Sequence, residues 1–132
     1  MEQSSAVARA AIALSFTAAT ALAVAGCPKR SQGNTRPEDR ARDTFESTCS
    51  TCHGTTGRGD GPAARALAVR PRDYTDATWQ RSITDDQIRA IIVKGGAGVG
   101  KSSLMPATSA MADDPEALDA LVAIVRSFGS AR

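Results

Sequence analysis

The sequence is poor in the side chains that build large cores and multi-ligand metal sites. Only 4% of its 132 residues are aromatic, and it holds one histidine and three cysteines. A small domain with so few aromatic residues has a thin core, and such domains commonly need a metal, disulfides or a cofactor. One histidine and two cysteines, with the third cysteine near the N-terminus, cannot close a four-ligand zinc site.

The chain also lacks a strong excess of charge of either sign. It has 16 basic and 14 acidic residues, a formal net charge of +2. No block of basic residues and no basic stripe interleaved with aromatics is present, so nucleic acid is not an expected partner. We find no internal repeat.

An apolar run rich in alanine and threonine covers residues 8–26, and it is short and weak for a membrane span. It ends in Val24-Ala25-Gly26-Cys27, which resembles a bacterial lipoprotein signal. This resemblance predicts a cleaved signal peptide over residues 1–26, a diacylglycerol on Cys27 and a polar tether over 27–36. The protein would then be exported to the periplasmic side of a bacterial membrane. An ordinary signal peptide and an uncleaved anchor are the alternatives.

The two remaining cysteines stand in Cys49-Ser50-Thr51-Cys52-His53, the attachment signature for c-type haem. In this pattern both thiols form thioethers with one porphyrin, and the adjacent imidazole of His53 binds the iron from the same face. The alternatives are a dithiol redox centre, which lacks its usual βαβ context, and half of a zinc site.

A glycine-rich stretch from Gly95 to Ser102 matches the phosphate-binding pattern GxxxxGK[ST] at every defined position. Phosphate binding needs a strand before this loop and a helix after it. A capped helix pattern precedes it instead, and Pro106 would break a helix that started at Ser102. The sequence therefore predicts no nucleotide site here.

The same stretch ends in Met105-Pro106, and Met105 is the expected sixth ligand of the iron. A thioether is a soft, neutral donor that suits haem iron. Met111 is the rival ligand. The remaining alternative is that Met105 only packs in the core and leaves the iron five-coordinate.

Three helices are predicted from local signals. The first begins at Pro37 and runs into the CxxCH motif, with Ala41 and Phe45 on the face that carries the two cysteines. The second begins at the capping box Thr84–Gln87, and we expect Gly95 to end it in a left-handed conformation. The third begins at Asp114-Pro115, and we expect Gly129 to stop it. Residues 55–73 show no sustained period and are predicted to form a long loop.

In sequence order, the motifs CSTCHGTTGRGDG, PRDYTDATW, VKGG, SLMPA and PEALDALVAIVRSFG resemble those of a class I cytochrome c of the bacterial monohaem type. The resemblance covers about residues 37–128. It implies an all-α fold in which a small bundle of three main helices, with loops, surrounds one covalently attached haem c. It assigns the cytochrome c domain to residues 37–132. The close crossing of the first and last helices in that family would fall at Ala41 and Ile124.

This resemblance implies an electron-transfer protein and not an enzyme. We expect a membrane-tethered carrier that passes single electrons between exported or membrane redox proteins. Its haem would be held by Cys49, Cys52, His53 and Met105. No acid–base pair and no nucleophile constellation accompanies these residues. The alternative function is a haem-based sensor or ligand-binding module, or a peroxidase-like enzyme, with a labile sixth ligand.

Several residues are weaker candidates. The candidates for hydrogen bonds or ion pairs to the haem propionates are Tyr74, Trp79, Arg72 and Arg81. Pro62 and Pro71 are the two candidates for the backbone carbonyl that orients His53 through its Nδ1–H, and the residues alone do not choose between them.

Overall fold

The computed structural model of the protein describes residues 36–130. The predicted signal peptide (1–26), Cys27 and residues 27–35 of the predicted tether lie outside the described residues. Residues 36–130 fold without a β-strand, as predicted, into helices joined by loops. None of the helices in this range is long and apolar enough to cross a membrane.

The first helical segment is continuous but changes its winding. It consists of α1 (Pro37–Thr44), a π-helical turn (Phe45–Cys49) and α2 (Ser50–His53). Proline stands at the first helical position, and Glu38 and Asp39 complement the positive end of the helix dipole. The prediction of a helix from Pro37 into the CxxCH motif is confirmed. The π-helical turn was not predicted.

The second predicted helix is α4 (Asp85–Lys94), and its N-terminus forms the predicted capping box. The hydroxyl of Thr84 accepts from the amide of Gln87, and the side chain of Gln87 accepts from the amide of Thr84. Gly95 ends the helix with a φ of 69°, as expected, but its ψ of 176° is extended and not left-handed helical. This conformation is essentially restricted to glycine.

The third predicted helix is α5 (Pro115–Ser130), which supplies much of the core. Its apolar stripe buries Leu118, Leu121, Val122 and Val125. The expectation that Gly129 stops this helix is wrong, because α5 continues through Ser130. Gly129 has another role: a Cβ at this position would lie 2.6 Å from Cγ of Gln80, so the glycine lets α5 approach that side chain closely.

A short helix that was not predicted, α3 (Ala77–Ser82), precedes α4. The carboxylate of Asp76 caps it by accepting from the amides of Thr78 and Trp79. Short 3₁₀ turns occupy Ala64–Ala66, Ala97–Val99 and Ser109–Asp113. The predicted loop over residues 55–73 is confirmed apart from the first of these turns.

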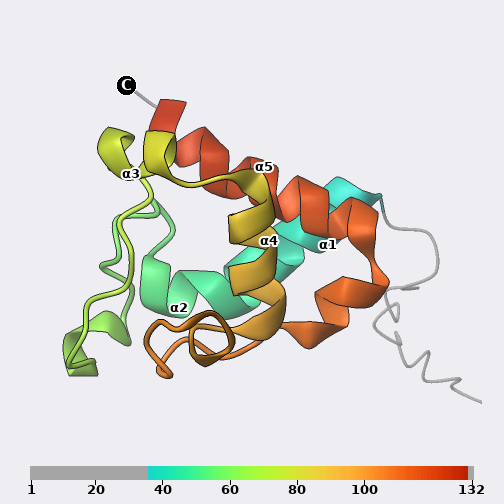
Figure 1. Cartoon of the computed structure of the whole chain (residues 1–132). Helices are drawn as coiled ribbons and strands as arrows, with labels where there is room; N and C mark the ends of the chain where they lie inside the picture. The colour runs from blue at the N-terminus through green and yellow to red at the C-terminus, as the bar shows by residue number, and fades with distance from the viewer. Residues whose placement is uncertain (1–35, 131–132) are drawn as a thin grey trace, which may run out of the picture. The chain divides into compact units, whose positions relative to one another are not determined.

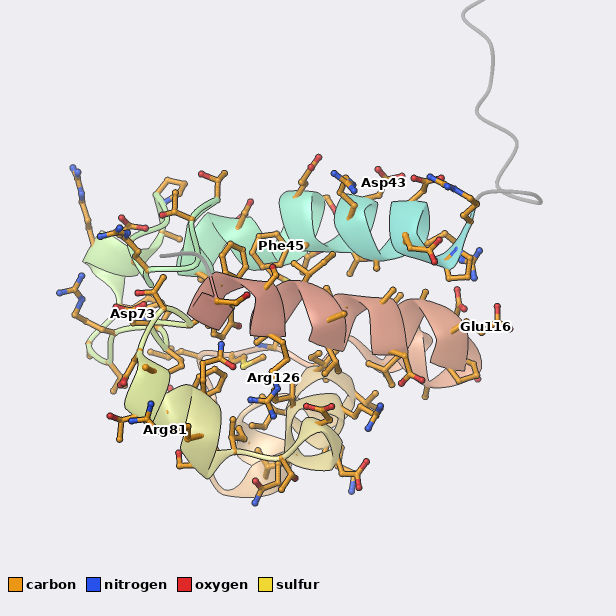
Figure 2. The ribbon with its side chains drawn as sticks, turned by 90° about the horizontal axis from the view of Figure 1, so that it is seen from above. Asp43, Phe45, Asp73, Arg81, Glu116 and Arg126 are labelled. Atoms are coloured by element: carbon orange, nitrogen blue, oxygen red, sulfur yellow. The ribbon has the colours of Figure 1, made fainter. Side chains whose placement is uncertain are left out.

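Helix α5 lies between the first helical segment on one side and α3 and α4 on the other (Figures 1 and 2). The guanidinium of Arg40 in α1 binds both carboxylate oxygens of Asp114, at 2.6 and 2.8 Å, and this carboxylate also caps α5. The hydrogen bonds from Arg40 hold the pKa of Asp114 below its usual range. Ala41 is fully buried and Ile124 packs against the same core cluster, so the first and last helices do pack closely.

Arg126 joins α5 to the α3–α4 corner. It donates to the backbone carbonyls of Gln80 and Ile83, at 2.6 and 2.7 Å, and to the carboxylate of Asp85 at 2.8 Å. Figure 2 shows Arg126 on the side of α5 that faces α3 and α4, whereas Arg81 of α3 points away from the other helices. Arg126 therefore satisfies carbonyls at the end of α3 that would otherwise lack partners.

Candidate functional site

One large cavity, of about 950 Å³, opens into the described part of the molecule. Its walls come from the end of the first helical segment, the loop over residues 55–73, helix α4, the glycine-rich loop and single faces of α3 and α5. The large apolar side chains in its lining are Phe45, Leu67, Val69, Trp79, Ile88, Ile91, Ile92, Leu104, Leu121 and Val125. The volume lies at the upper end of the range for ligand pockets. Cys49, Cys52, His53 and Met105 all line this same cavity.

The π-helical turn carries Cys49 to the cavity wall, and α2, which follows it, carries Cys52. The wider winding of the turn is closed by the amide of Ser50, which donates to the carbonyl of Phe45 five residues earlier. The hydroxyls of Ser47 and Ser50 donate to the carbonyls of Asp43 and Glu46, at 2.6 and 2.7 Å. Bonds of this kind, from a hydroxyl to the carbonyl four residues earlier, often bend a helix. Single π turns occur frequently at functional sites, and no residue preference in the sequence marks this one.

The two thiols are free in this structure. Burial, with a smaller contribution from Cys52, raises the pKa of Cys49 to about 11. A redox-active CxxC needs the opposite shift, because the thiolate is the reactive species. Among residues 36–130, no group of three or more His, Cys, Asp and Glu side chains is arranged to hold a metal ion. The raised pKa of Cys49 therefore argues against a dithiol centre, and the zinc interpretation has no support in the geometry of residues 36–130.

His53 is 7% exposed and has a defined tautomer. Its Nδ1 lies 3.0 Å from the carbonyl oxygen of Arg72, and a carbonyl only accepts, so Nδ1 carries the proton. Burial lowers the pKa of His53, so the ring is neutral at pH 7 and the lone pair of Nε2 is free to bind a metal. Neither Pro62 nor Pro71 supplies the orienting carbonyl, and that pair of candidates was wrong. The loop over residues 55–73 brings the next carbonyl after Pro71 into reach.

The candidates for contacts with the haem propionates differ in whether they line the cavity. Tyr74, Trp79 and Arg72 line the cavity, and the guanidinium of Arg72 lies 5.9 Å from the centre of the Trp79 ring. Arg72 also lies 3.9 Å from the carboxylate of Asp76. Arg81 does not line the cavity, and its guanidinium donates to the hydroxyl of Thr78 at 3.5 Å.

The glycine-rich loop folds back on the backbone of Met105. The amide of Gly96 donates to the carbonyl of Met105 at 3.0 Å, and the amide of Lys101 donates to the carbonyl of Gly96 at 2.7 Å. A third bond, from Thr108 to Ile92 at 2.8 Å, ties the end of the loop to α4. Helix α4 precedes the loop and a turn follows Ser102, so neither the strand nor the helix of a phosphate-binding loop is present. The glycines hold the Met105 segment instead.

The two candidate methionines occupy different environments. Met105 is half-buried and lines the cavity together with His53. Met111 is buried in the 3₁₀ turn Ser109–Asp113, belongs to the core cluster and does not line the cavity. Of the two thioethers, the geometry offers only that of Met105 to a group bound beside His53.

We expect Gly96→Ala to disturb the position of Met105 far more than Gly100→Ala does. A Cβ on Gly96 would collide with the carbonyl oxygen of Ser102, whereas a Cβ on Gly100 would meet no atom within 4 Å. Gly100 has a left-handed φ of 70°, so alanine there costs about 1 kcal/mol. At Gly96 the cost should approach about 3 kcal/mol, as in overpacked sites. Thermal unfolding of the two loaded variants measures the difference, and equal losses would contradict this account of the loop.

Comparison with protein families gives one match. The model of the family described as cytochrome C oxidase, cbb3-type, subunit III matches residues 36–124. This range contains the CxxCH motif, Met105 and all the residues that line the cavity except Val125. Comparison with curated proteins and with solved structures gave no match.

Proposed function

The chain belongs to the family of c-type cytochrome domains described as cytochrome C oxidase, cbb3-type, subunit III, and we propose that it is a monohaem electron carrier with His53 and Met105 as the axial ligands. Membership of this family implies a covalently attached haem c and redox partners. When bound, the haem supplies an iron that takes up and releases one electron.

The residues of the cavity fit this group. Two thiols three positions apart line it, and the imidazole that follows them has a free Nε2. The large apolar side chains of the lining suit a porphyrin, and among residues 36–130 the one carboxylate on the wall is that of Asp73, whose oxygen accepts from the amide and hydroxyl of Thr75. In this proposal Cys49 and Cys52 hold the haem covalently, and the carbonyl of Arg72 keeps His53 in the tautomer that can bind iron.

The observation that carries the electron-transfer proposal is that His53 and Met105 line one cavity, because two filled axial positions leave no site for a substrate. A sensor or peroxidase would need one of these positions open or labile. The test is a potentiometric titration of the purified protein followed by its visible spectrum, with carbon monoxide added to the reduced form. We expect a single one-electron transition and no change with carbon monoxide. Rapid carbon monoxide binding by the wild type would favour the ligand-binding function.

We further propose that Cys27 carries a lipid and holds the domain at the periplasmic side of a bacterial membrane. The support is the sequence Val24-Ala25-Gly26-Cys27 after an apolar run. Diacylglycerol with a further acyl chain gives firm membrane binding, whereas a single chain gives only marginal binding. The mass of the mature N-terminus should show the lipid on Cys27, and Cys27→Ser should release soluble protein or leave the signal attached. An unmodified mature N-terminus would exclude the anchor.

A further inference from the structure

The ring of Tyr74 lies flat against the ring of His53. The two ring centroids are 4.4 Å apart and the planes differ by 12°. Tyr74 is 7% exposed, so burial alone does not distinguish it from an ordinary core residue. Its position does, because it covers a face of the one imidazole that the proposed function assigns to the iron.

The backbone of Tyr74 is held at both its amide and its carbonyl. The amide donates to the carbonyl of Gly57 at 2.7 Å, and the carbonyl accepts from Nε2 of Gln80 at 2.7 Å. The same nitrogen of Gln80 donates to the carbonyl of Val125 in α5 at 2.9 Å. Arg126 then binds Gln80 twice, at its carbonyl and at Oε1. Tyr74 is therefore fixed relative to α5 and not only to its own loop.

The carbonyl of Arg72 and the ring of Tyr74 restrict His53 in different ways. A hydrogen bond at Nδ1 holds one edge of the imidazole, but its broad angular tolerance still permits small rotations of the ring about the Cβ–Cγ bond. A flat aromatic contact opposes this rotation, because turning the imidazole out of the plane would separate the two faces or push them together. The two contacts together restrict the ring orientation more than either contact does alone.

From this geometry we propose that Tyr74 is a positioning residue that sets the plane of the His53 imidazole, with Gln80 and Arg126 as its support. The proposal rests on the proposed function, in which His53 is an iron ligand. The plane of an axial imidazole determines how unevenly unpaired electron density spreads over the four quarters of a ferric haem. The aromatic face is the essential feature, and the hydroxyl of Tyr74 is not.

The competing explanation is that Tyr74 only fills space in the core. Phe128 is the matched control, because its ring belongs to the same aromatic cluster, 6.1 Å from Tyr74 and 5.3 Å from Phe45, and has no ring contact with His53. Removal of either ring should lower stability. Only removal of Tyr74 should change the orientation of the imidazole.

The experiment compares Tyr74→Leu, Tyr74→Phe and Phe128→Leu as full-length, haem-loaded, oxidised proteins by proton NMR. The shifts of the four haem methyl groups report the imidazole plane. We expect Tyr74→Leu to narrow their spread or change their order, and Tyr74→Phe and Phe128→Leu to keep the wild-type pattern. A wild-type pattern in Tyr74→Leu, with only a lower unfolding temperature, would overturn the proposal.

If Tyr74→Leu does not yield loaded protein, Gln80→Met tests whether Tyr74 sets the plane of the His53 imidazole. It removes the bond to the carbonyl of Tyr74 without changing any residue that contacts His53, and a smaller shift change in the same direction is expected. An unchanged pattern would count against the proposal. Failure of the proposed function looks different, because the wild type itself would then lack the spectrum of a low-spin haem with two protein ligands.

Discussion

Replacement of both Cys49 and Cys52 by alanine is expected to abolish stable haem-loaded protein. Both thiols line the cavity on consecutive turns of one helical segment, and both are free to form thioethers. Without the covalent links, only the two axial ligands would hold the haem, and a small domain with a cavity of about 950 Å³ would lose the group that fills it. The measurement is the haem that remains with the denatured protein after acid–organic extraction.

The matched control for this prediction is Thr51→Ala. Thr51 stands between the two cysteines, is exposed and has no role as a ligand. We expect this variant to keep its haem through extraction, as the wild type should. Free extraction of haem from the wild-type protein would show that the attachment is not of the c type.

The three longer helical segments were predictable because their signals are local. The capping box at Thr84, the cap at Asp114 and the prolines at positions 37 and 115 each act within one turn of chain, so a short stretch of sequence contains the whole interaction. The identity of the group to be bound was predictable for the same reason, because the CxxCH motif is contiguous.

Helix α3 and the π-helical turn escaped prediction although their bonds are local, whereas other missed features depend on contacts between distant residues. The carbonyl that orients His53 belongs to Arg72, 19 positions away, and a backbone atom leaves no trace in residue type. Arg126 bonds to Gln80, 46 positions away, yet on its own it is typical of a solvated helix face. Gly129 illustrates the same limit. The sequence predicts that this glycine ends α5, but in the fold it permits a close approach to the side chain of Gln80.

The glycine-rich loop shows how context decides between two interpretations of one pattern. Every defined position of the phosphate-binding pattern is present from Gly95 to Ser102, but the pattern acts only between a strand and a helix. Helix α4 stands where the strand would have to be. Gly95 and the neighbouring Gly96 instead let the chain pass close to Met105, whereas Gly100 has no close neighbour.

Met105→Ala is expected to remove the sixth ligand and convert the carrier into a ligand-binding protein. Met105 lines the cavity with His53, and the bond from Gly96 to its carbonyl holds the backbone in place. Ferric haem with His/Met ligation has a weak sulfur-to-iron absorption band in the far red, and this band should disappear. The reduction potential should fall, because the thioether favours the ferrous state. Imidazole and carbon monoxide should then bind to the opened position.

Two variants test whether this effect belongs to Met105 alone. Met111→Ala should lower stability by about 2–5 kcal/mol, as the truncation of a buried methionine does, and should keep the far-red band. Lys101→Ala should leave the visible spectrum and the reduction potential almost unchanged, because an exposed, screened lysine contributes little to either.

Loss of the band in Met111→Ala but not in Met105→Ala would reverse the ligand assignment without contradicting the proposal that the protein is a c-type cytochrome. Saturable ATP binding that depends on Lys101 would contradict the conclusion that this loop binds no nucleotide. That conclusion rests on α4 before the loop and Pro106 after it, which leave no place for a phosphate.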